Sequence, residues 1–88
     1  MADVQVTCIN KRDRENRHES ITHLGGANWK WTRSQVIDSI NAMSNTFYTF
    51  NDGRRADVKV VHGASGDYVR TQRDGIWTDN LLALAECV

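Results

Sequence analysis

Apolar and polar residues alternate near the start of the chain, and this alternation predicts a half-buried β-strand. Val4, Val6 and Cys8 are spaced by two, and the pattern carries the strand to about Lys11. A second β-prone segment follows at 20–24 and stops at a Gly-Gly turn signal. The two segments are expected to pair as a hairpin. The charged stretch between them has mixed signs and no periodicity, which is typical of a solvated loop.

The strongest helix signal follows in the middle of the chain. Thr32 stands three residues before Gln35, which is the spacing of a capping box. From there apolar residues recur at helical spacing as far as Met43, with polar residues on the other side. The pattern predicts a helix over 33–43, ended near Asn45 because asparagine tolerates the left-handed conformation.

An aromatic, β-prone segment follows the helix, and an Asn-Asp-Gly turn joins it to a segment in which valines alternate with charged residues. A two-residue loop would set Phe47 opposite Val58. A three-residue loop would instead set Tyr48 opposite Ala56. The second register is favoured, because it places Tyr48 and Phe50 on the valine face and exposes only Phe47.

A second hairpin and a leucine-rich tail complete the chain. Pairing across the next glycine-containing turn would set Val61 opposite Tyr68 and Lys59 opposite Arg70. The tail carries three leucines in four positions from 81 to 84, which favours docking on the domain because exposed leucines are costly in water.

These elements predict one small α+β domain over residues 1–88, in the order β-β-α-β-β-β plus a short C-terminal helical or extended segment. An antiparallel sheet of about five strands is expected, with the one main helix on one face. Hydrophobic residues make up 40% of the chain and charged residues 25%, which argues against disorder. Eleven basic residues balance eleven acidic ones. Neutral charge disfavours a dedicated nucleic-acid binder, because such proteins usually carry a basic excess.

The two cysteines, Cys8 and Cys87, match no zinc spacing and form no Cys-x-x-Cys pair. The chain begins without a signal-peptide pattern, and no apolar run is long enough to cross a membrane. A cytoplasmic protein with reduced thiols is therefore expected. Cys8 shares a strand face with Val4 and Val6, so it is expected to be buried and free.

The second half of the chain also carries a family pattern. Its residues are Tyr68-Val69-Arg70-Thr71, Asp74, Asp79-Asn80-Leu81, Leu84 and Cys87. This pattern resembles the C-terminal signature of domain-of-unknown-function family 3892, a family of short bacterial proteins. The resemblance extends to the N-terminal strand, the central helix and the aromatic strand. It departs at Ala85, where a proline is expected. It implies a fold but no activity.

Candidate metal ligands and cofactor motifs are sparse. His18, His23 and His62 form no metal-binding spacing. His23 and His62 would meet across a single sheet, but ordinary strand histidines are the expectation. The glycine clusters match neither a P-loop nor a dinucleotide-binding fingerprint. Neither a metal nor a cofactor is therefore expected.

Candidate catalytic residues are equally few. Cys8 and His23, on predicted partner strands, form the one thiol–imidazole pair in view, which makes a small thiol-dependent enzyme the third hypothesis. Asp74 and Asp79 could flank a site, although Asp79 more simply caps a helix. The protein is expected not to be an enzyme.

A binding surface is expected on the outer face of the sheet. Its residues are Arg55, Asp57, Lys59, Tyr68 and Arg70, bordered by Asp79 and Asn80 in the tail. A sheet covered on one side leaves such a face to solvent, where charged residues are ordinary. The favoured function is a non-catalytic binding or interaction module for a protein or peptide. The protein itself is expected to be a monomer or a weak dimer joined through strand edges.

Single-stranded nucleic acid is the alternative ligand, with Tyr68 and Phe47 stacking on bases and the arginines meeting phosphates. The three tryptophans have two candidate roles. Trp29, Trp31 and Trp77 are expected to close the core at the ends of the helix and sheet. Their alternative role is an aromatic and basic surface for a ligand.

Overall fold

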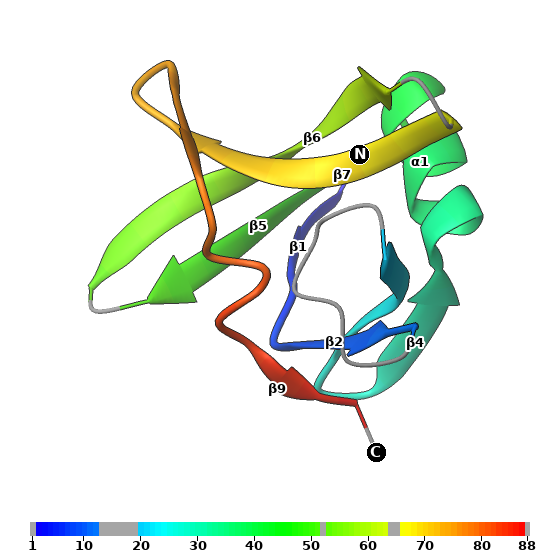
Figure 1. Ribbon diagram of the computed structural model, residues 1–88, viewed down its shortest axis with the longest axis horizontal. Helices are drawn as coiled ribbons and strands as arrows, with labels where there is room; N and C mark the ends of the chain where they lie inside the picture. Colours follow the sequence, from blue (N-terminus) through cyan, green and yellow to red (C-terminus); the bar gives the residue numbers. More distant parts are fainter. Residues whose placement is uncertain (1, 13–19, 52, 64–65, 88) are drawn as a thin grey trace.

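A computed structural model describes residues 2–12, 20–51, 53–63 and 66–87 (Figure 1). Within these residues, two β-sheets and one α-helix enclose a single core. The prediction of one antiparallel five-stranded sheet with a helix on one face is therefore wrong. Most of the charged loop predicted between the first two strands, His18 included, lies outside the described residues.

The larger sheet has five strands in the order β1-β5-β6-β7-β8. β1 runs parallel to β5, and the other neighbours are antiparallel. The strands are β1 (Ala2–Gln5), β5 (Asn45–Asn51), β6 (Arg54–Gly63), β7 (Gly66–Arg73) and β8 (Ile76–Thr78).

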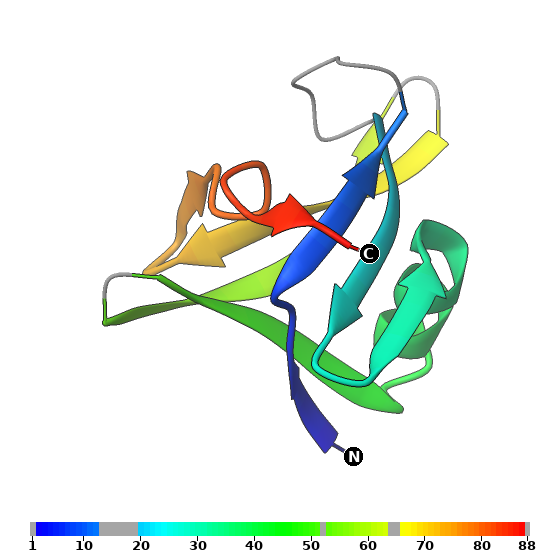
Figure 2. The ribbon, with the colours of Figure 1, turned by 90° about the horizontal axis from the view of Figure 1, so that it is seen from below.

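The smaller sheet has four strands in the order β4-β3-β2-β9. The C-terminal strand β9 pairs in parallel with β2, so the C-terminal tail lies beside the second strand of the chain (Figure 2). The strands are β2 (Cys8–Lys11), β3 (Ile21–Gly26), β4 (Trp29–Thr32) and β9 (Ala85–Glu86).

The alternation that predicts one long N-terminal strand covers two strands in different sheets. The chain turns at Val6 and Thr7. The Val6 amide donates to Tyr48 in the larger sheet, and the Thr7 amide donates to Gly25 in the smaller one, each over 2.8 Å. Val6 itself is buried. Burial at the junction of two sheets continues the period of two, so the alternation does not reveal the turn.

The helix α1 (Arg33–Asn41) begins as predicted, with Thr32 as the N-cap of a complete capping box. It ends two residues before the predicted end. Met43 adopts a positive φ of 57° and is 78% exposed, so it does not extend the buried helix face. Asn45 begins β5 instead of ending the helix. The helix contacts strands of both sheets, and its buried residues, Val36 and Ile37, join the common core.

The β5–β6 hairpin has the two-residue loop and not the favoured three-residue one. Asn51 pairs with Arg54, and Thr49, not Tyr48, pairs with Ala56. Phe47 is consequently 2% exposed. Its ring centroid lies 5.7 Å from that of Trp29 and 6.0 Å from that of Trp31. The smaller sheet thus supplies an apolar site for Phe47 that a one-sheet fold does not offer.

Two other predictions for the second half are confirmed. Val61 pairs with Tyr68, and Lys59 pairs with Arg70, across the β6–β7 hairpin. The C-terminal tail docks, because Leu81 is completely buried in the core. The buried core residues come from both sheets, the helix and the tail: Val6, Ile9, Ile21, Leu24, Val36, Ile37, Phe47, Val58, Val69 and Leu81.

Candidate functional site

One face of the larger sheet points away from the core, and strand register defines its residues. Paired residues on neighbouring strands place their side chains on the same face. One row of pairs crosses all five strands: Gln5, Tyr48, Asp57, Gln72 and Trp77. The same face carries Asp3, Thr46, Phe50, Arg55, Lys59, Val61, Tyr68 and Arg70. We call this set the outer face. All of its members are exposed or half-buried.

Arg55 organises one half of the outer face. Its guanidinium donates to both carboxylate oxygens of Asp3, over 2.6 and 3.0 Å, and to Asp57 over 2.9 Å. It also lies 4.3 Å above the centre of the Tyr48 ring. The hydrogen bonds from Arg55, and a further one from Thr46, lower the pKa of Asp3 from its ordinary value. The same bonds to Asp3 and Asp57 raise the pKa of Arg55.

The other half of the outer face is held by Arg70. Its guanidinium donates to the Thr78 carbonyl over 3.2 Å and to Asp79 over 3.1 Å. Lys59, between the two arginines, is exposed and has no ion pair within the described part of the chain. A hollow of about 270 Å³ lies beside it, with Asp3 and Arg55 among its lining residues.

Two aromatic side chains on this face are left to solvent. Phe50, at the end of β5, is 53% exposed, and Trp77 on β8 is 43% exposed. Sequence reasoning missed both as site residues, because the favoured hairpin register buries Phe50 and Trp77 was assigned to core closure. A correct register for β5 would have found Phe50. Tyr68 is half-buried and packs against Gly63, where an added Cβ would come within 2.8 Å of the ring.

The structure places the residues of the predicted surface in two different locations. Arg55, Lys59, Tyr68 and Arg70 all lie on the outer face, and Asp79 borders it through its ion pair with Arg70. Asn80 does not belong with them. Its side-chain amide donates to the hydroxyl of Thr49 over 3.4 Å, and Thr49 is completely buried on the opposite face. Asn80 therefore tethers the tail to the core side of the sheet.

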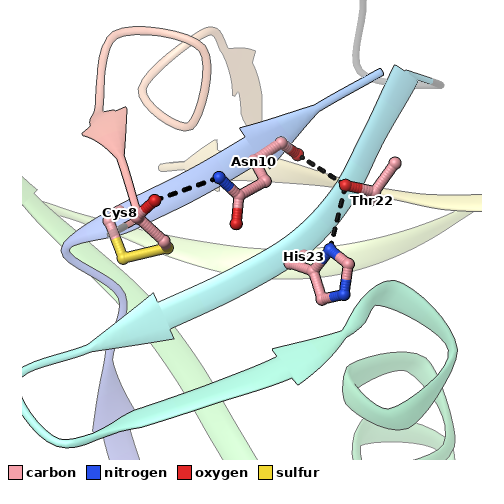
Figure 3. Close-up of a disulfide and its surroundings, with 5 residues drawn as sticks. Cys8, Asn10, Thr22 and His23 are labelled. Carbon is pink, nitrogen blue, oxygen red and sulfur yellow. Dashed lines mark hydrogen bonds between the residues drawn. A yellow bond between two sulfur atoms is a disulfide. The ribbon is translucent and has the colours of Figure 1, made fainter.

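The cysteines contradict the prediction of free, reduced thiols. Cys8 and Cys87 form a disulfide that joins β2 to the residue after β9. Figure 3 shows it on one face of the smaller sheet, beside Asn10, whose side chain donates to the Cys87 carbonyl over 3.2 Å. Gly25 lies opposite Cys8, and an added Cβ there would approach both sulfur atoms within 2.9 Å. The lack of a side chain at Gly25 thus leaves room for the bond.

The predicted thiol–imidazole pair does not form. Cys8 is bonded to Cys87, and His23 lies opposite Asn10 and contacts the hydroxyl of Thr22 at 3.0 Å (Figure 3). His23 and His62 belong to different sheets, so they do not meet across one sheet. Among the described residues, no three side chains of metal-ligating type gather into a site.

The tryptophans and two carboxylates are the remaining candidate site residues. Trp29 and Trp31 pack edge-to-face against each other, and both rings pack against buried Phe47, which confirms their role in closing the core. Trp77 contradicts that prediction, since it stands on the outer face. The carboxylates of Asp74 and Asp79 are largely exposed and pair with different arginines, Arg73 and Arg70. They do not flank a common site.

Fold and site together define the chain as a small two-sheet β domain that leaves one sheet face open to solvent. Residues 5–85 match the family described as Protein of unknown function (DUF3892), and the chain belongs to this family. No curated protein and no solved structure matches it. Within the described residues, no helix has the length and apolar character needed to cross a membrane.

Proposed function

We propose that the protein is a non-catalytic binding module that receives its ligand on the outer face. The observation that carries this proposal is the exposure of Phe50 and Trp77 on a sheet face where Arg55 and Arg70 are already held by hydrogen bonds to carboxylates. Exposed aromatic rings with fixed polar neighbours suit recognition, because the rings supply contact area and the polar groups fix orientation. A face arranged before binding also loses less conformational freedom on binding.

Single-stranded nucleic acid is the second candidate. Exposed rings beside Arg55, Lys59 and Arg70 favour it, since base stacking and phosphate contacts are its usual recognition elements. Phe47, one of the two rings on which the sequence hypothesis relied, is buried and takes no part. Binding of this kind would weaken steeply with salt, because phosphate contacts release counterions.

An array experiment tests the proposed function. Labelled protein is applied to immobilised oligosaccharides, single-stranded oligonucleotides and peptides. One class is expected to retain the wild-type protein and to lose a double variant, Phe50→Ser with Trp77→Ser. The matched control is Met43→Ser with Ile76→Ser, which also removes two exposed apolar side chains but lies off the outer face. Retention by no class, or equal retention of both double variants, would overturn the proposal.

Location in the cytoplasm stays a prediction, and the disulfide argues against it. Disulfides persist mainly in oxidising compartments and are rare in the cytosol. Alkylation of a fresh cell extract before unfolding decides the question. Labelled Cys8 and Cys87 would support a reducing compartment, whereas protected cysteines would place the protein in an oxidising one.

A further inference from the structure

The charges of the outer face cancel one another. Three cations face three carboxylates among the described residues of this surface and its border: Arg55, Lys59 and Arg70 against Asp3, Asp57 and Asp79. Both arginines already hold carboxylates. A polyanion placed here would meet three negative groups and would have to compete for the guanidinium hydrogen bonds. The face is therefore better matched to an uncharged ligand than to a phosphate backbone.

The exposed rings of the outer face are spread out rather than clustered. Phe50 lies on β5 and Trp77 on β8, which corresponds to roughly 14 Å across the strands at the usual strand spacing. Phe50 also lies two residues along β5 from Tyr48, the member of the Trp77 row. Between them lie hydrogen-bonding groups, the amide of Gln72 and the carboxylate of Asp57. Protein interfaces instead bring aromatic residues together in an apolar centre with few charges. The spacing suits a ligand that offers apolar surfaces and hydroxyl groups in alternation.

We infer that the outer face binds a neutral oligosaccharide, an inference that rests on the proposed function of this face. One side of a sugar ring exposes C–H groups, whose positive partial charge faces the negative face of an aromatic ring. Its hydroxyls both donate and accept, so they can bond the carboxylate of Asp57 and the amide of Gln72. To reach both Phe50 and Trp77, the chain must cross the strands from β5 to β8, which requires several sugar units.

The test is calorimetric titration with neutral oligosaccharides, namely cellohexaose, maltohexaose and N-acetylchitohexaose. Oligothymidylate and an uncharged Gly/Ser/Tyr peptide serve as the competing classes. We expect at least one oligosaccharide to bind with a Kd below about 1 mM. Its affinity should be equal at about 50 and about 200 mM NaCl, because no counterions are released.

Variants of Trp77 and Phe50 test whether the oligosaccharide binds on the outer face. Trp77→Ala and Phe50→Ala should each weaken oligosaccharide binding about tenfold, and Trp77→Phe should retain most of it because a ring remains. Ile76→Ala is the matched control: Ile76 is also exposed on β8 but pairs with Arg73, outside the row that contains Trp77. Thermal melts of every variant establish that it is folded.

Each result separates the two proposals. Binding of oligothymidylate or of the peptide, lost in Trp77→Ala, would overturn the oligosaccharide and keep the proposed function. Oligosaccharide binding that is unchanged in both alanine variants would overturn both. Failure of all three oligosaccharides to bind at about 1 mM would overturn the inference, and failure of every probe would count against the proposed function as well.

Discussion

At the scale of single residues, Arg55 determines the arrangement of the outer face. One guanidinium holds two carboxylates, from β1 and β6, while its flat surface covers the ring of Tyr48 on β5. A planar group with several fixed donors can do this, whereas a lysine ammonium cannot match the paired geometry. Arg55 thereby links three strands on the solvent side of the sheet.

The pKa of Asp3 reports this contact. The Arg55 and Thr46 hydrogen bonds lower it, so the pKa of Asp3 should lie below its ordinary value of 3.8. A lowered pKa in the folded state means that the Asp3–Arg55 pair stabilises the protein at pH values above the unfolded-state pKa of Asp3. This stabilisation is lost as the pH falls through the folded-state pKa. NMR titration of the side-chain carboxyl checks this. Arg55→Lys should move the pKa back towards the unfolded value, and an unmoved pKa would contradict the assignment.

At the scale of elements, the helix N-terminus is fixed by local chemistry. Thr32→Ala removes the acceptor of the Gln35 amide hydrogen bond, which is 3.2 Å long. The loss should be about 1 kcal/mol, which corresponds to a fall in Tm of about 4–8 °C for a domain of this size. Ser34→Ala is the control, because Ser34 is exposed in the first turn and is not the cap. Equal melting of the Thr32 variant and wild type would show that the capping box contributes nothing.

Sequence reasoning succeeded where the decisive contacts are local. The Thr32–Gln35 box and the Lys59–Arg70 register each depend on residues close in the chain, and the structure has both. It failed at Val6 and at Phe47, whose positions depend on a second sheet formed by distant segments. The same long-range packing determines which aromatics reach the outer face. Arg55, Lys59, Tyr68 and Arg70 were predicted on it because charged alternation on a strand is also a local signal.

The tail shows how one residue anchors an element. Leu81 is completely buried, while its neighbours Leu82 and Leu84 pack against the core only in part. Leu81→Ala should cost about 2–5 kcal/mol, through lost burial and the cavity left behind. Leu84→Ala should cost clearly less. Urea denaturation of both variants measures the difference, and equal losses would mean that the tail has no single anchor.

At the scale of the whole molecule, the smaller sheet joins the C-terminal tail to β2, near the start of the chain. β2 follows directly on the turn at Val6, and β9 is formed by the last residues of the tail. β9 contributes only two paired residues, so its hydrogen bonds alone give little stability. The Cys87 amide donates to the Ile9 carbonyl over 3.1 Å, and the disulfide closes the same junction covalently. Nearly the entire chain lies between the two bonded cysteines.

Reduction of the Cys8–Cys87 disulfide is expected to lower the stability of the protein strongly. The cysteines are separated by 79 residues. A cross-link over a loop of that length removes conformational freedom from the unfolded chain worth about 4.5 kcal/mol. Because a domain of this size has a total stability of about 5–15 kcal/mol, breaking the bond should lower Tm by roughly 20 °C or more. Thermal melts with and without a thiol reductant measure the shift.

The variant Cys8→Ser with Cys87→Ser separates the bond from other effects of the reductant. It should melt near the reduced wild type and should not respond to the reductant. In the unreduced native protein neither cysteine should react with an alkylating reagent, whereas both should react after reduction and unfolding. A wild-type Tm that the reductant leaves unchanged, together with cysteines that label without reduction, would mean that the C-terminal tail is held by β9 and Leu81 alone.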